Sequence, residues 1–125
     1  MDYVRVKAKI RNIYKPKLEV ELELVADTGA IYTVVNRKHL ESLEIGPTDK
    51  RRFKVADGKI VTREVGLAQI EIVNEITHST IVFGEPEDAE VLGVTTLEEL
   101  GLQVDPVAGQ LKPLELLLLF DRSIM

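Results

Sequence analysis

A single aspartate, Asp27, stands where an alternating apolar segment breaks into a tight turn, in the tripeptide Asp27-Thr28-Gly29. The apolar segment before it covers residues 18–26, and another follows at residues 30–35. A carboxylate in such a turn could act as a general acid or base. If the chemistry needs a pair of carboxylates, the second one must come from a second copy of the chain.

Other residue types exclude several chemistries. The chain has no Cys, which removes disulfides, thiol nucleophiles and Cys-ligated metals. His39 and His78 have no companions at ligand spacing, so we expect no metal ion, and we expect no organic cofactor either. The net charge of −5, with Lys and Arg dispersed along the chain, argues against a nucleic-acid partner.

Length and composition indicate one soluble domain. The 125 residues suit a single domain over residues 1–125, with its core at residues 3–113. Hydrophobic residues make up 45% and charged residues 30%, as in globular proteins. No signal peptide is expected, and the apolar run 116–120 is far shorter than the roughly 20 residues of a membrane span. We therefore expect a cytoplasmic protein without a membrane partner.

The first half of the chain predicts strands and one helix. Apolar residues alternate with Arg and Lys over residues 4–11 and with Glu over residues 18–24, which predicts two half-buried strands. Their outward faces carry opposite charge, so we expect cross-strand ion pairs if they are neighbours. A third strand is predicted at residues 31–35, followed by a short helix over residues 37–43 with Asn36 as its cap.

The second half predicts more strands and another helix. Asp57-Gly58 is typical of the turn in a hairpin, here over residues 52–65. Two capping-box spacings, Thr95 with Glu98 and Thr96 with Glu99, predict a short helix. Many short strands with two short helices indicate a mostly-β domain, a small barrel or a sandwich. The remaining strands are expected at residues 67–73, at residues 77–83 and in a hairpin over residues 104–111.

Three segments of the sequence occur in an informative order. The turn Ala26-Asp27-Thr28-Gly29-Ala30 comes first, the hairpin around Ala56-Asp57-Gly58-Lys59 second, and Val91-Leu92-Gly93 with a short helix third. In this order they resemble the catalytic loop, the flap and the apolar-apolar-Gly motif of the retropepsin-like (retroviral-type) single-domain aspartic proteases. The resemblance covers residues 3–113 and implies a small closed or partly open acid-protease β-barrel with one or two short helices.

The resemblance also implies a function and a set of site residues. It implies an aspartic endopeptidase, a homodimer in which Asp27 from each subunit forms a catalytic dyad that activates a water. Thr28 would brace this dyad across the twofold axis, and Gly29 would permit close backbone approach. The implied substrate is a peptide or an unfolded protein, and no cofactor is needed. The residues that would bind it are Ala30 in the loop, Ala56, Asp57 and Gly58 in the flap, and Val91 and Leu92 in the pocket wall.

Departures from the family pattern keep other readings open. Family members often carry an Asp two positions after the loop glycine and an Arg after the second motif, where this chain has Ile31 and Val94. One alternative is a catalytically silent dimer of the same fold that binds peptides or extended protein segments without cutting them. Another is a monomeric β-domain that serves as an assembly module. Asp27 alone could also be an ordinary Asx-turn residue.

The C-terminal tail, residues 114–125, contains five Leu and a Phe within its first seven positions. Such an apolar segment makes a poor free tail. It could form a final strand or helix packed on its own domain, or it could form the dimer interface. We favour the interface, because the half-site must find a partner and a twofold interface is self-complementary.

Overall fold

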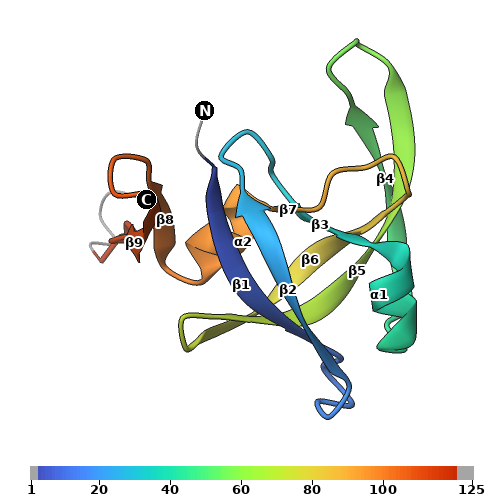
Figure 1. The fold of residues 1–125 in the computed structure, drawn as a ribbon, viewed down its shortest axis with the longest axis horizontal. Coiled ribbons are helices and arrows are strands. Elements are labelled where there is room, and N and C mark those ends of the chain that lie inside the picture. Colours follow the sequence, from blue (N-terminus) through green and yellow to red (C-terminus); the bar gives the residue numbers. More distant parts are fainter. Residues whose placement is uncertain (1–2, 121–125) are drawn as a thin grey trace.

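The computed structural model describes residues 3–120, and Figure 1 shows a fold built mainly of strands with two short helices. Strands make up about half of the described chain and helices about a tenth. In chain order the elements are β1 (Val4–Arg11), β2 (Glu19–Ala26), β3 (Thr33–Asn36), α1 (Arg37–Ser42), β4 (Asp49–Lys54), β5 (Ile60–Ile72), β6 (Glu75–Gly84), β7 (Val91–Leu92), α2 (Val94–Glu99), β8 (Leu102–Asp105) and β9 (Gln110–Pro113).

Seven of these strands form one sheet, in the order β1-β2-β7-β3-β6-β5-β4, which curls until β1 also pairs with β5. The pairs β2–β7 and β3–β6 are parallel and the other pairs are antiparallel, so the sheet is an irregular ring rather than a regular barrel. β8 and β9 form a separate two-stranded sheet, the predicted last hairpin. The expected mostly-β, acid-protease-like fold with short helices is confirmed.

Alternation along β1 and β2 builds one wall of the core. The apolar residues of β1 are buried, and its charged residues point outward. On that outward face Lys7 lies opposite Glu23, and Arg11 Nε lies 2.6 Å from a carboxylate oxygen of Glu19. The predicted pairing of opposite charges across these two strands is therefore confirmed.

The first helix agrees with the sequence prediction, and the second departs from it. The Asn36 side chain accepts a hydrogen bond from the Lys38 N–H at 2.9 Å, as expected for the cap of α1. α2 begins directly after Gly93, which offers no side chain for capping. The predicted capping boxes at Thr95 and Thr96 are wrong, because both threonines lie inside the helix.

β4 and β5 form the long hairpin that projects from the ring in Figure 1. Its turn lies at Asp57-Gly58 as predicted, and Gly58 has a φ of 89°, which favours glycine. β5 runs without a break from Ile60 to Ile72, so the strand predicted at residues 67–73 is its second half rather than a separate strand. β6 follows after a turn in which Val73 and Asn74 both have positive φ.

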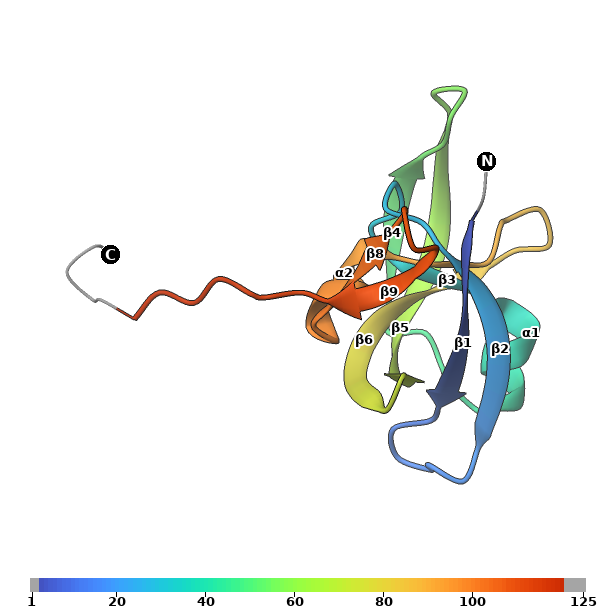
Figure 2. The ribbon, with the colours of Figure 1, turned by 60° about the vertical axis from the view of Figure 1, so that its left-hand side comes forward.

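Figure 2 shows the C-terminal segment Leu114–Phe120 running away from the sheets. This segment has no regular secondary structure, and every side chain from Leu116 onward is exposed, from 58% for Leu119 to 94% for Phe120. The alternative in which the tail packs as a strand or helix on its own domain is therefore wrong for the part that the structure describes, whereas the favoured dimer interface stays a prediction. Residues 121–125 of the predicted tail lie outside the described residues. Within residues 3–120, no helix has the length and apolar character needed to cross a membrane.

Candidate active site

The carboxylate of Asp27 lies just beyond the end of β2, in a turn fixed by hydrogen bonds. The Asp27 N–H donates to the Leu92 carbonyl oxygen at 3.1 Å, which ties the turn to β7. The Ala30 N–H donates to the Asp27 carbonyl oxygen at 3.1 Å and closes the turn. The Gly29 N–H donates to Asp27 Oδ1 at 2.8 Å, so the Asx turn that the sequence permits is present. The exposed side chain thus presents a carboxylate in a defined orientation to solvent.

The residues that follow Asp27 keep its carboxylate accessible. A Cβ at Gly29 would lie 3.2 Å from Asp27 Oδ1, so a larger residue at this position would crowd the carboxylate. Thr28 is exposed beside it. Both residues lie where the sequence places them, in the loop around the candidate acid–base group.

The segment after β7 is hydrogen-bonded to the loop that follows Asp27. The Val94 N–H donates to the Ala30 carbonyl oxygen at 2.8 Å, and the Thr95 N–H donates to the Ile31 carbonyl oxygen at 3.0 Å. Gly93 is in close contact with the same loop, since a Cβ there would lie 2.3 Å from the Tyr32 carbonyl carbon. The backbone of residues 93–95 therefore packs against the loop at a distance that only glycine allows.

A buried chain of hydroxyl groups continues this support into the core. The Gly93 N–H donates to Thr33 Oγ1 at 3.0 Å, Thr33 Oγ1 lies 2.7 Å from Thr96 Oγ1, and that atom lies 2.8 Å from Ser79 Oγ. Ser79 Oγ donates to Glu99 Oε1 at 2.7 Å. Because the Ser79 hydroxyl gives its one hydrogen to Glu99, the directions of the other bonds follow: Thr96 donates to Ser79, and Thr33 donates to Thr96. Each of these hydroxyl groups both donates and accepts a hydrogen bond. The connected hydroxyls therefore stabilise the packing of β3, β6 and α2 next to the site.

Asp27 borders a cavity of about 960 Å³ that lies between its turn and the β4–β5 hairpin. The turn contributes Asp27, Gly29 and Ala30, and the hairpin contributes residues of β4, of β5 and of the turn between them. Tyr32 and Phe53 both line this space and meet edge to face, with ring centroids 6.1 Å apart. Within residues 3–120, no three His, Asp or Glu side chains gather closely enough to hold a metal ion.

The predicted substrate-binding residues divide into three groups. Ala30, Ala56 and Val91 line the cavity. Asp57 and Gly58 are exposed at the tip of the hairpin, beyond the cavity wall. Leu92 is fully buried in the core, so its assignment to the pocket wall is wrong: in β7 its side chain alternates to the side opposite Val91. Its part in the site is the carbonyl oxygen that accepts from Asp27.

The sequence analysis did not predict that charged residues form part of the cavity wall. Arg51 and Arg63 lie directly opposite each other on β4 and β5, and both border the cavity. Arg63 binds Asp88 with two hydrogen bonds, of 2.6 and 2.9 Å, and lies 3.3 Å from Glu87. The pair with Arg63 holds the pKa of Asp88 below its usual range. The sequence does show an acidic loop after β6 and basic residues in the hairpin strands. Nothing in their spacing along the chain indicates that these two segments are in contact.

Arg37 fixes the same acidic loop from the other side. Its guanidinium lies 2.6 Å from Glu64 and 3.3 Å from Glu85, and it stacks over the Phe83 ring at 5.3 Å from the centroid. Its hydrogen bond to Glu64, followed by that to Glu85, raises the pKa of Arg37. Together with the Arg63–Asp88 pair, this cluster anchors the loop after β6 to the base of the hairpin.

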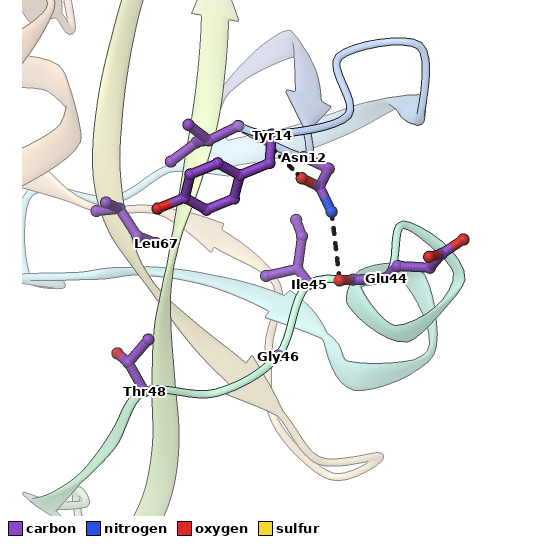
Figure 3. A pocket seen from close by; sticks show the side chains of 8 residues that line it. Asn12, Tyr14, Glu44, Ile45, Gly46, Thr48 and Leu67 are labelled. Carbon is purple, nitrogen blue, oxygen red and sulfur yellow. Dashed lines mark hydrogen bonds between the residues drawn. The ribbon is translucent and has the colours of Figure 1, made fainter.

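A second cavity, of about 170 Å³, lies between the β1–β2 turn and the segment after α1, and is drawn in Figure 3. The buried Asn12 side chain donates to the carbonyl oxygens of Leu43 and Glu44, at 2.9 and 3.2 Å, and accepts from the Tyr14 and Lys15 N–H groups at 2.8 and 3.0 Å. All four hydrogen-bonding positions of its amide are thus used. The Glu44 carboxylate is paired with Lys15 Nζ at 2.7 Å. This cavity lies at a structural junction, where Asn12 ties the β1–β2 turn to the segment after α1.

Comparison with known proteins agrees with this geometry. A family model described as an aspartyl protease matches residues 6–96, a span that holds the Asp27 turn, the β4–β5 hairpin and the segment from Val91 to Gly93. The match covers more than half of the chain, which therefore belongs to the retropepsin-like aspartyl protease family. No curated protein matches the chain. The resemblance found in the sequence is confirmed.

Proposed function

We propose that this chain is an aspartic endopeptidase that acts as a homodimer, with Asp27 from two subunits as the catalytic dyad. The observation that carries the proposal is the position of Asp27, an exposed carboxylate on a hydrogen-bonded loop at the edge of a cavity of about 960 Å³. Membership of the aspartyl protease family supports the same reaction class. The whole chain acts as one domain, and because it supplies one such aspartate, the second comes from the partner.

The proposed reaction is hydrolysis of a peptide bond by general acid–base catalysis. Two carboxyl groups a hydrogen bond apart cannot both be ionised, so the dyad holds one proton. The ionised Asp27 takes a proton from a water, whose oxygen attacks the carbonyl carbon, while the protonated Asp27 of the other subunit donates its proton to the carbonyl oxygen. The tetrahedral intermediate then collapses: the Asp27 that took the proton of the water gives it to the amide nitrogen, and the other Asp27 takes a proton from one hydroxyl of the intermediate. The C–N bond breaks as the C=O bond re-forms, an acid and an amine leave, and the dyad again holds one proton.

The neighbouring residues take supporting roles in this proposal. Thr28 hydrogen-bonds across the twofold axis, and Gly29 leaves space for substrate beside the carboxylate. Ala30, Ala56 and Val91 contact the substrate within the cavity. The hairpin tip at Asp57-Gly58 closes over the bound peptide and excludes water from the reacting bond.

The exposed apolar tail supports the proposed dimer. Five consecutive large apolar side chains, from Leu116 to Phe120, are exposed to solvent in the single chain. Their burial in a second copy would remove an apolar surface that is unusual for a monomer. Deletion of residues 116–125 should shift the sedimentation coefficient from dimer to monomer and abolish cleavage together. A full-length chain that sediments as a monomer during turnover would contradict the proposed dyad.

The decisive test is Asp27→Asn, with Asp105→Asn as the matched control. Both aspartates accept backbone N–H hydrogen bonds within their own turns, at 2.8 Å for Asp27 and 3.1 Å for Asp105, and asparagine can keep those bonds. Cleavage of a fluorogenic peptide library between pH 3 and pH 7 should fall by about 10²- to 10⁴-fold in Asp27→Asn. It should be unchanged in Asp105→Asn. Equal activity of Asp27→Asn and the unmodified protein would refute the assignment.

One observation favours a second candidate, a peptide-binding dimer that does not cut. Ile31 and Val94 stand where family members often carry a charged pair, so the surroundings of the site differ from the usual ones. A statine-type inhibitor separates the two functions. Cleavage that the inhibitor blocks supports the endopeptidase, whereas inhibitor binding without cleavage of any peptide supports the silent binder.

A further inference from the structure

The cavity wall formed by the hairpin is basic, although the chain as a whole is acidic. The net charge of the chain is −5, but β4 has the sequence DKRRFK. Strand alternation places Arg51 on the face of the hairpin that carries Phe53, opposite Arg63 and Val61 of β5. All four of these residues border the cavity. Arg52 and Lys54 of β4 border the cavity as well, so three guanidinium groups and one ammonium group accompany the apolar side chains on this wall.

Arg63 is already fully engaged within the protein. Its side chain is 15% exposed, and it forms the bidentate pair with Asp88 and the contact with Glu87. These bonds direct its positive charge toward the loop after β6. Arg63 is therefore not available to bind a substrate carboxylate.

Arg51 differs from Arg63 because most of its donors are free. Its side chain is 46% exposed, and among residues 3–120 it is Nη1 that donates, to the Asp49 carboxylate and to the Lys50 carbonyl oxygen. The Asp49 side chain is 62% exposed. An ion pair that is so accessible to water contributes little binding energy. The Tyr32 side chain also interacts with the Arg51 guanidinium. Within residues 3–120 no hydrogen bond is formed by Nε or Nη2 at ordinary distance and angle, and this edge of a guanidinium binds a carboxylate through two parallel hydrogen bonds.

The surroundings of Arg51 would strengthen such a contact. Tyr32 and Phe53 form an aromatic pair on the same wall, and Val61 lies next to them across the hairpin. A bound peptide would cover this wall and displace water, which strengthens charge-assisted hydrogen bonds. A substrate side chain here would be acidic, and its neighbours would be apolar.

We propose that Arg51 is a specificity-determining residue that selects peptides with a Glu or Asp side chain close to the cleaved bond. This inference rests on the proposed endopeptidase function and names the substrate class of the same cavity. A charge-assisted pair at a partly exposed site should favour Glu over Gln about tenfold in kcat/KM.

The test uses octapeptides of Ala, Leu and Phe that carry a single Glu or a single Gln at each position in turn. Cleavage is measured with the unmodified protein, with Arg51→Gln and with Lys50→Gln. Lys50 is the matched control, because it lies on the same strand, its removal changes the net charge equally, and it does not border the cavity. Binding of the same peptides is measured with Asp27→Asn protein, with and without Arg51→Gln.

The inference expects a preference for Glu of about tenfold at one or two positions, loss of this preference in Arg51→Gln, and its retention in Lys50→Gln. Arg51→Lys should keep part of it, because lysine retains the charge but not the bidentate geometry. Equal use of Glu and Gln peptides, or an equal loss in Arg51→Gln and Lys50→Gln, would overturn it.

The two measurements distinguish failure of this inference from failure of the proposed function. Cleavage without any preference for acidic peptides refutes the role of Arg51 and leaves the endopeptidase standing. Preferential binding of Glu peptides through Arg51 without cleavage refutes the endopeptidase and supports the selection. If no peptide is cut or bound, both are wrong. Circular dichroism of each variant checks that the fold is intact.

Discussion

Substitution of Gly93 by Ala should destabilise the fold and disturb the site at once. An alanine Cβ would lie 2.3 Å from the Tyr32 carbonyl carbon, 2.6 Å from the Tyr32 carbonyl oxygen and 2.7 Å from the Ile31 carbonyl oxygen. All three are backbone atoms, so no side chain can turn aside, and the nearest contact is more than 1 Å short of the ordinary 3.4 Å. Overpacking of this kind costs about 3 kcal/mol of unfolding free energy.

The assay is urea unfolding followed by circular dichroism, at a fixed protein concentration because the stability of the proposed dimer would depend on concentration. With an m value of about 2 kcal/mol per M, the loss should lower the midpoint by about 1.5 M. Gly46→Ala is the matched control, since a Cβ at Gly46 would meet no atom within 4 Å. It should leave stability equal or raise it by about 0.4–1 kcal/mol through the unfolded chain.

The displaced backbone in Gly93→Ala should also reduce cleavage, because the Val94 N–H holds the Ala30 carbonyl oxygen at 2.8 Å within the Asp27 turn. A midpoint for Gly93→Ala equal to that of Gly46→Ala would show that the loop and the segment after β7 are not in the close contact described.

Two further changes test the polar interactions around the site. Thr96→Val removes the central hydroxyl of the buried chain and leaves Ser79 with an unused acceptor position, so it should cost about 1–3 kcal/mol in urea unfolding. Thr95 lies one position earlier on α2 and is half-buried, so Thr95→Val should cost less than half as much unfolding free energy. Equal losses in the two variants would contradict the proposed importance of the hydrogen-bonded hydroxyl groups. Because Arg63 lowers the pKa of Asp88 in the folded state, this carboxylate adds stability above its unfolded pKa of 3.8, and the contribution is lost as the pH falls below that value. Asp88→Asn should lower stability at pH 7 by about 1–2 kcal/mol and reduce the further loss between pH 4 and pH 2, and an unchanged acid profile would contradict the pairing.

Much of the fold could be predicted from local patterns, because those patterns record which face of an element is buried. Alternation identified β1 and β2, their opposite charges predicted ion pairs across them such as that of Arg11 with Glu19, and Asn36 marked the start of α1. The turn at Asp57-Gly58 was also predictable, since its conformation is set by residues next to each other in the chain.

The errors occurred where distant contacts override local preference. Thr96 has the spacing of a helix cap, but its hydroxyl is used by Thr33 and Ser79, which lie far away in the sequence. Leu92 belongs to the apolar-apolar-Gly motif, yet its side chain is in the core while Val91 reaches the cavity, a choice made by the pairing of β7 with β2 and β3. The cavity position of Arg51 depends on the register of β4 with β5, which no short-range pattern states.

The two sides of the cavity are held by different interactions, and this difference suits hydrolysis of a bulky substrate. The Asp27 side rests on backbone hydrogen bonds and on buried hydroxyls with no solvent exposure, such as Thr33 and Thr96, so displacement there would leave polar groups unsatisfied. The hairpin side is exposed at its tip and is tied down at its base by the Arg63–Asp88 pair, so its tip can move at lower cost. A catalytic carboxylate must stay within a narrow geometry, whereas a peptide can enter only if the covering wall gives way. The substitutions should therefore fall into two groups. Changes in the segment that supports the Asp27 turn, such as Gly93→Ala and Thr96→Val, should lower stability and kcat together. Arg51→Gln should alter the preference among peptides with little change in stability.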